Sequence, residues 1–182
     1  IPPLEASSMY AGMMIDTNNF TNRTGVRTFE AAAFLRRCGA DIPYVRKIFR
    51  DDMDSYRAKA SIISNAEVYR QQFAIARGQN LRVDSPTIIG AQAANELLDI
   101  EGIRASFVLT VYQGRIYVSA RSIDEVNVQI IMEELGGGGH QTVAGVQLDN
   151  KRAVDIMPQI ISLAKKQLEE IDNNESDLTA RY

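Results

Sequence analysis

The chain has 182 residues, of which 45% are hydrophobic and 24% charged, a composition that suits roughly one or two globular domains with real cores. Its net charge of −3 argues against a long nucleic acid as partner, because that binding normally needs a basic face. No apolar run approaches the ~20 residues of a membrane span, and the single cysteine excludes an internal disulfide.

The pattern at the start of the chain predicts helices. Apolar Leu4, Met9 and Met13 follow one another at helical spacing, and this first helix should end at the polar stretch that begins with Asp16. Capping and spacing signals predict three more helices, over residues 28–37, 41–49 and 51–63. We therefore expect an all-helical first domain over residues 1–60.

The second domain, residues 61–182, mixes strands and helices. Ser85 followed by Pro86 predicts a helix start, and Gln113-Gly114 between alternating segments predicts a β-hairpin. The expected strands cover residues 68–76, 105–112, 115–120 and 144–148, and the expected helices cover residues 85–98, 127–135 and 152–171. We predict a mixed α/β domain with a mainly antiparallel sheet and helices packed on one face.

Four consecutive glycines precede the only histidine of the chain: Gly136, Gly137, Gly138, Gly139 and His140. Each glycine loses roughly 0.5–1 kcal/mol more on folding than alanine would. A chain tolerates this where its backbone must approach something closely or adopt a positive φ. A run of backbone amides ending in an imidazole is suited to holding a phosphate. The alternative is a flexible turn between a helix and a strand.

Asp16 is the first side chain that points to chemistry. It follows an apolar run, so its carboxylate is a candidate to hold a hard divalent cation in a cleft. The alternative is a helix-capping or Asx-turn aspartate. The acidic residues Asp51, Asp52 and Asp54 instead indicate the solvated start of a helix.

Arg121 is the second candidate, at the end of a predicted hairpin strand, where a guanidinium can bind phosphate bidentately. Ser119 and Ser122 offer hydroxyl donors nearby, and Asn127 lies just before the helix that leads to the glycines. The alternative is a surface arginine with Asn127 as a helix N-cap. Residues 23–28, with two arginines and two threonines, either line the same cleft or form a basic surface loop.

These motifs resemble a known family. Residues 119–122, Asn127 and the Gly-Gly-Gly-Gly-His run resemble the DHH-associated domain of the Asp-His-His (DHH) phosphoesterases. Residues 16–20, with 27–32 behind them, look like the last stretch of the catalytic DHH domain. Together they are most similar to bacterial cyclic-di-AMP phosphodiesterases. The alternative within the superfamily is the nanoRNase/phosphoadenosine-phosphate phosphatase branch, where the first motif more often reads Asp-Thr-Gly.

The resemblance implies a bacterial hydrolase of nucleotide signalling that uses two Mn²⁺ ions in the DHH domain. Asp16 matches the last of the metal ligands. The others should lie before Ile1, so we expect this chain to be the helical C-terminal part of a DHH domain plus the whole associated domain, and to be inactive by itself. The family also implies a parent anchored at the cytoplasmic face of the membrane, with this piece soluble, and a homodimer to which the apolar first helix contributes.

Physical considerations suggest a division of roles in the intact enzyme. The substrate would be a cyclic dinucleotide or a short diadenylate. His140 and Arg121 would be the catalytic residues of this part, and they would hold a phosphate oxygen together with the amides of the four glycines. Ser119, Ser122 and Asn127 would support the substrate, and Asp16 would help to hold a metal ion.

Overall fold

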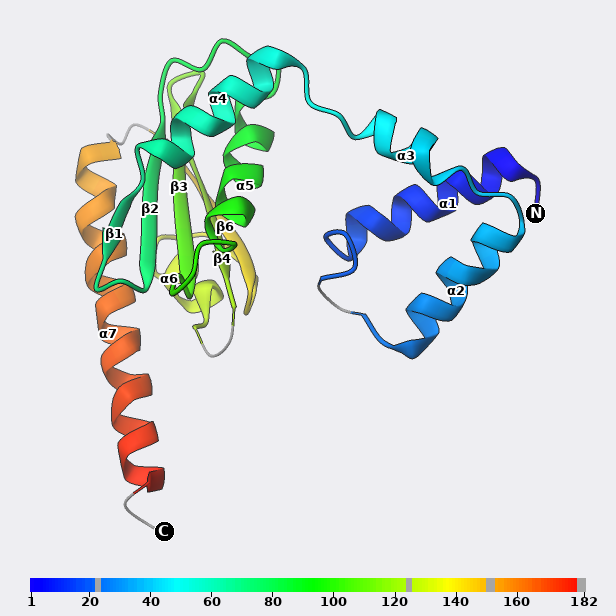
Figure 1. The fold of residues 1–182 in the computed structure, drawn as a ribbon. Coiled ribbons are helices and arrows are strands. Elements are labelled where there is room, and N and C mark those ends of the chain that lie inside the picture. Colours follow the sequence, from blue (N-terminus) through cyan, green and yellow to red (C-terminus); the bar gives the residue numbers. More distant parts are fainter. Residues whose placement is uncertain (22–23, 124–125, 150–152, 180–182) are drawn as a thin grey trace. The chain divides into compact units, whose positions relative to one another are not determined.

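The computed structural model describes residues 1–21, 24–123, 126–149 and 153–179, with side chains described up to residue 171. The chain divides into two compact units, Ile1–Asp51 and Asp52–Tyr182 (Figure 1). The division lies before helix α4 (Met53–Ser64) and not after residue 60, because α4 packs on the second unit and adds Ile62 to its core.

Unit 1 consists of helices α1 (Pro3–Asp16), α2 (Val26–Arg37) and α3 (Ile42–Ile48), as the sequence predicts. Its buried core is small and contains Ala6, Leu35 and Ala40. Gly39, with φ 96°, ends α2 in the conformation that favours glycine. The helical prediction for this part is therefore confirmed.

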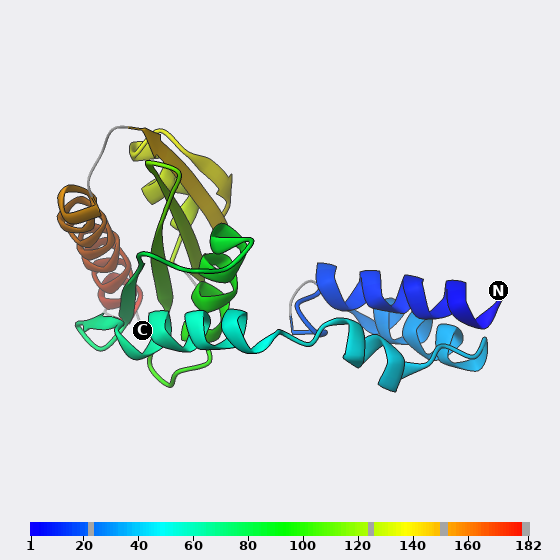
Figure 2. The same ribbon diagram turned by 90° about the horizontal axis from the view of Figure 1, so that it is seen from above.

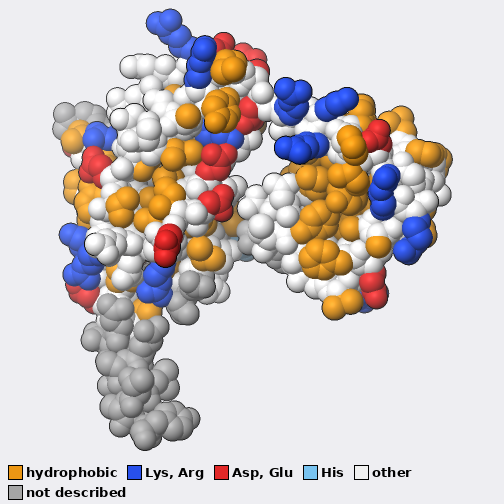
Figure 3. Space-filling view, viewed as in Figure 1, with side chains coloured by type: hydrophobic (Ala, Val, Ile, Leu, Met, Phe, Trp, Pro, Cys, Tyr) orange, Lys and Arg blue, Asp and Glu red, His pale blue; other side chains and the backbone are white. Residues whose placement is uncertain are grey.

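Hydrophobic side chains form a patch on the surface of unit 1 (Figure 3). The exposed large hydrophobic residues of this unit include Leu4 and Met9 of α1 and Phe29 and Phe34 of α2. Contiguous apolar surface of this kind marks contact sites in soluble proteins. The expected homodimer interface on the first helix has a suitable surface and stays a prediction. Among the described residues, no helix combines the length and the apolarity needed to cross a membrane.

Unit 2 is built on a six-stranded sheet with the strand order β1-β2-β3-β4-β6-β5. The β2–β3 pair is parallel and the other pairs are antiparallel, so the predicted mainly antiparallel sheet is confirmed. The strands are β1 (Glu67–Tyr69), β2 (Phe73–Gly78), β3 (Ala105–Tyr112), β4 (Arg115–Ser122), β5 (Gly138–His140) and β6 (Val143–Asp149). Helix α5 (Pro86–Leu97) connects the parallel pair.

Helices cover both faces of this sheet, which corrects the expectation of one covered face (Figure 2). Helices α4 and α5 pack on one face with a core that includes Ile62, Leu97 and Val108. Helices α6 (Val128–Glu134) and α7 (Ala153–Thr179) pack on the other face with Ile131 and Ile160. The unbroken buried run over the first six residues of β3 is typical of a strand covered on both sides.

The turns explain where prediction and structure agree or differ. Gln113 (φ 49°) and Gly114 (φ 76°) form the predicted hairpin turn between β3 and β4. The predicted strand over residues 68–76 is divided into β1 and β2, because Arg70 and Gln71 also have positive φ, of 50° and 58°. Strand β5, within the glycine run, was not predicted.

Candidate functional site

Arg121 lies half-buried near the end of β4. Its Nε donates to Oδ1 of Asn95 at 2.9 Å, and its Nη1 donates to the carbonyl oxygen of Ala120 at 2.9 Å. Among the described residues, no carboxylate pairs with this guanidinium. Burial lowers the pKa of Arg121, because loss of water penalises the cation. A bound anion would compensate for that loss.

The sheet register brings His140 to the same face as Arg121. Arg121 pairs with Val143 across β4 and β6, and Val143 pairs with His140 across β6 and β5. Directly paired residues point to the same face of a sheet. Two strand spacings separate Arg121 and His140, or about 10 Å between Cα atoms. A guanidinium and an imidazole at this separation can approach one phosphate group from two sides.

The neighbouring row on the same face carries almost no side chains. Ser119 pairs with Gly145, and Gly145 pairs with Gly138. Val143, in the row of Arg121, is 37% exposed, and His140 is also exposed. We call this surface the open strip, and it consists of Ser119, Arg121, Gly138, His140, Val143 and Gly145.

Two of the four glycines cap the C-terminal end of α6. Gly136, with φ 85°, donates its amide to the carbonyl of Glu133 at 2.9 Å, and the Gly137 amide donates to that of Met132 at 2.8 Å. This is the usual hydrogen-bond pattern of a glycine-terminated helix. The expectation that all four amides hold a phosphate is therefore wrong for Gly136 and Gly137, whose amides are already engaged.

Gly137, Gly138 and Gly139 differ sharply in the space that a side chain would have. A Cβ on Gly139 would lie 2.5 Å from Cα of Ala144, and the residue has φ 147°. A Cβ on Gly137 would lie 2.5 Å from Cβ of Val146. A Cβ on Gly138 would meet no heavy atom within 4 Å. The fold therefore explains the glycines at 137 and 139, whereas Gly138 keeps open a space on the strip.

Ser122 and Asn127 have structural roles, which corrects the expectation that they support the substrate. Ser122 is buried, and its hydroxyl donates to the carbonyl of Val126 at 2.7 Å. One residue from Arg121 along a strand, it points to the opposite face of the sheet. Asn127 is the N-cap of α6, because its Oδ1 accepts from the amides of Gln129 and Ile130.

Asp16 is the last residue of α1 and is exposed. The turn after it is made by Thr17, whose Oγ1 donates to the carbonyl of Met13 at 2.6 Å and accepts from the amide of Phe20 at 3.0 Å. Asn18, Asn19 and Phe20 have φ of 45°, 57° and 64°. Three successive left-handed residues are uncommon and mark local backbone strain.

The residues that the structure describes do not form a complete metal site. Within the described part of the chain, no three His, Cys, Asp or Glu side chains lie close enough together to hold a metal ion. Asp16 thus offers a single carboxylate. Arg23, from the predicted basic loop, lies outside the described residues, and Arg27 is exposed on α2.

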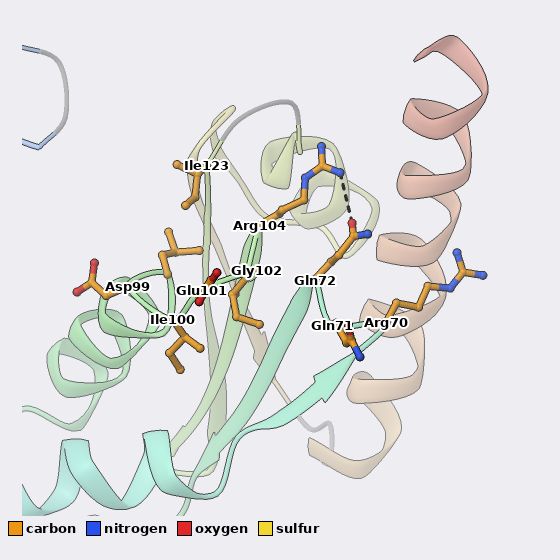
Figure 4. A pocket seen from close by; sticks show the side chains of 11 residues that line it. Arg70, Gln71, Gln72, Asp99, Ile100, Glu101, Gly102, Arg104 and Ile123 are labelled. Atoms are coloured by element: carbon orange, nitrogen blue, oxygen red, sulfur yellow. Dashed lines mark hydrogen bonds between the residues drawn. The ribbon is translucent and has the colours of Figure 1, made fainter. Parts of the chain in front are cut away.

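A separate hollow of about 550 Å³ lies where β2 and β3 begin and β4 ends (Figure 4). Both of its arginines already have partners in the protein. Arg104 donates from Nη1 to Oε1 of Gln72 at 3.3 Å, and Arg70 pairs with Glu169 at 3.1 Å. None of the residues predicted from the sequence to form the site lines this hollow.

Residues 79–170, half of the chain, match the family model described as the DHHA1 domain. The chain belongs to the DHHA1 domain family. The match includes the whole open strip. It also includes Asn95, which sequence reasoning missed because its contact with Arg121 depends on α5 lying over β4.

The DHHA1 chain is also similar to curated phosphodiesterases. It is 41% identical over 160 residues to the cyclic-di-AMP phosphodiesterase PdeA of Listeria monocytogenes, covering 87% of this chain and 24% of that protein. It is 45% identical over 148 residues to the cyclic-di-AMP phosphodiesterase GdpP of Geobacillus thermodenitrificans, covering 81% of this chain and 22% of that protein. The chain thus spans about a quarter of the length of these relatives.

A solved structure shows the same fold. The crystal structure of an exopolyphosphatase-related protein from Bacteroides fragilis matches with a TM-score of 0.79 at 24% identity, covering 93% of this chain and 53% of that chain. The predicted mixed α/β architecture, a helical part followed by a DHHA1 domain with a mainly antiparallel sheet, is therefore confirmed. The assignment of the helical part to a DHH domain stays a prediction.

Proposed function

We propose that this chain is part of a manganese-dependent phosphodiesterase that hydrolyses cyclic-di-AMP to linear diadenylate, and that its DHHA1 domain supplies the substrate-phosphate site. The observation that carries the proposal is the single row of the sheet shared by Arg121 and His140, beside the bare position at Gly138. The identity of 41–45% with cyclic-di-AMP phosphodiesterases supports this choice of substrate.

The chemistry of the open strip is that of anion binding. Arg121 has a charged edge with no carboxylate partner among the described residues, and it would donate charge-assisted hydrogen bonds to a phosphate oxygen. His140, exposed at the edge strand, would donate a further hydrogen bond from its imidazole. Ser119 offers a hydroxyl in the adjoining row, and Gly138 allows close approach of the ligand.

The role of metal in this proposal is limited to Asp16. Metal ions in phosphodiesterases stabilise the charge that develops on the reacting oxygens. Asp16 would contribute one carboxylate, and further ligands would have to come from outside the described residues. In this view the chain positions the phosphate and, without those ligands, does not hydrolyse it.

Isothermal titration calorimetry tests the proposal with three ligands: cyclic-di-AMP, linear diadenylate and 3′-phosphoadenosine 5′-phosphate. We expect the purified chain to bind the diadenylates, and to bind them less tightly when His140 is replaced by alanine. Preference for 3′-phosphoadenosine 5′-phosphate would favour the nanoRNase/phosphatase alternative. Lack of binding to all three ligands would refute the phosphate site.

A hydrolysis assay with added Mn²⁺ tests the metal part separately. The absence of a three-residue metal cluster among the described residues favours a nucleotide-binding fragment that is inactive alone. We expect no cleavage of cyclic-di-AMP by the chain at any manganese concentration. Cleavage would show that the chain carries a complete catalytic site. Sedimentation velocity on the same sample tests the proposed homodimer.

A further inference from the structure

We propose that Asn95 is a positioning residue that fixes the orientation of the Arg121 guanidinium toward the open strip. The nature of the ligand rests on the proposed function, whereas the orientation of the guanidinium does not. The contact that carries the inference is the 2.9 Å hydrogen bond from Nε of Arg121 to Oδ1 of Asn95.

Asn95 is itself held firmly, because α5 is fixed against β3. The buried hydroxyl of Ser106 donates to the carbonyl of Ala94, the residue before Asn95, at 2.6 Å. One turn earlier, a Cβ on Gly90 would lie 2.1 Å from Oγ1 of Thr110, so the helix and the strand are in close contact there. The carboxamide of Asn95 therefore extends from a rigid support.

The two hydrogen bonds of Arg121 define the plane of its guanidinium. Nε is occupied by Asn95, and one hydrogen of Nη1 is occupied by the carbonyl of Ala120. Of the five donors of an arginine, these two are used, and the other three, one on Nη1 and two on Nη2, have no partner among the described residues. Such donors can bind phosphate oxygens by charge-assisted hydrogen bonds.

The partner at Nε is neutral, which matters for anion binding. A carboxylate there would orient the guanidinium but would also offset part of its charge. A carboxamide oxygen orients it and leaves the full positive charge for the ligand. Asn95 thus combines orientation with an unneutralised cation.

The test compares Asn95→Ala with Asn95→Asp, which keeps an acceptor oxygen at the same place. Binding of linear diadenylate is measured by calorimetry on the full chain. We expect Asn95→Ala to raise Kd about tenfold, the usual effect of disturbing a hydrogen bond to a charged group. We expect Asn95→Asp also to bind less tightly than the parent chain, because its carboxylate offsets part of the charge of Arg121. An affinity of Asn95→Ala equal to that of the parent chain would overturn the inference.

Arg121→Lys serves as the matched background, since lysine keeps the charge but has no Nε to hold. In this background Asn95→Ala should cause no further loss of affinity. A full tenfold loss there would mean that Asn95 acts independently of Arg121.

A readout without ligand separates this inference from the proposed function. The Nε–Hε signal of Arg121 in a ¹H–¹⁵N spectrum should be visible in the parent chain and in Asn95→Asp, and should be broadened by solvent exchange in Asn95→Ala. An unchanged signal in Asn95→Ala refutes the positioning role even if no nucleotide binds. Failure of binding with the expected signals refutes only the phosphate site.

Discussion

Replacing Gly138 by alanine tests whether the open space on the strip belongs to a ligand. The structure gives no internal reason for glycine at this position. Its φ lies outside the positive range, and an added Cβ would meet no heavy atom within 4 Å. Gly138→Ala should therefore fold normally, and any loss of function should come from the space that the methyl group fills.

The expected effects on stability and on binding have opposite signs. An alanine that fits its backbone restricts the unfolded chain and stabilises a protein by about 0.4–1 kcal/mol. For a domain of this size such a gain raises Tm by roughly 2 °C. The same methyl group would push a phosphate away from Arg121 and His140, and we expect affinity to fall at least about tenfold, or 1.4 kcal/mol.

Gly139→Ala is the matched control, one residue further along the same strand. Its φ of 147° and the 2.5 Å approach of the added Cβ to Cα of Ala144 make alanine strained there. A backbone forced into a disfavoured region costs about 1–3 kcal/mol, so this variant should lose stability. Thermal melting followed by circular dichroism measures the change in stability, and calorimetry with linear diadenylate measures the change in affinity.

An unchanged Kd for diadenylate in Gly138→Ala would mean that the space above Gly138 is unrelated to the ligand. Destabilisation of Gly138→Ala as strong as that of Gly139→Ala would mean that the surroundings of the two residues do not differ as the structure shows.

Three further predictions concern the same sheet. His140→Ala should raise Kd for diadenylate about tenfold with unchanged Tm, since the imidazole is exposed; unchanged Kd would remove His140 from the site. Ser122→Ala should lower the free energy of unfolding in urea by about 1–3 kcal/mol, because it leaves buried carbonyls without their donor, and should leave Kd unchanged. Ser119→Ala should instead raise Kd and leave the free energy of unfolding unchanged; the opposite pattern in the two variants would mean that the two faces are exchanged. Gly90→Ala should cost about 1–3 kcal/mol by overpacking, and less in a Thr110→Ala background, because the added Cβ would meet Oγ1 of Thr110 at 2.1 Å; an equal cost in both backgrounds would contradict this contact.

Local signals were sufficient to predict most of the elements. Pro86 at the first position of α5 and the Gln113-Gly114 turn are decided by the backbone preferences of a few residues, and both were located correctly. The turn between β1 and β2 was missed because Arg70 and Gln71 adopt positive φ without a glycine. The unit boundary was missed because the partner of α4 depends on tertiary packing and not on the pattern of the helix itself.

The candidate site was partly predictable, and one error was avoidable. Residue type and position beside the glycine run point to Arg121 and His140, but their placement in one row depends on a register across three strands, which no local pattern specifies. The face on which Ser122 lies could, by contrast, have been predicted from the sequence. Once residues near Arg121 are read as a strand, alternation requires Ser119 and Arg121 to share a face and Ser122 to lie on the other.

The turn after Asp16 distinguishes the two interpretations that the sequence allowed. A capping or Asx-turn aspartate would accept hydrogen bonds from the amides that follow it. In the described residues Thr17 does this instead, by accepting from the amide of Phe20, and the ring of Phe20 stacks on that of Phe29 with centroids 5.8 Å apart. Strain of this kind persists only where surrounding contacts maintain it, and it is concentrated at functional sites. The turn therefore keeps its shape without a hydrogen bond to the carboxylate of Asp16, which argues against the capping interpretation. The role of Asp16 as a metal ligand stays a prediction.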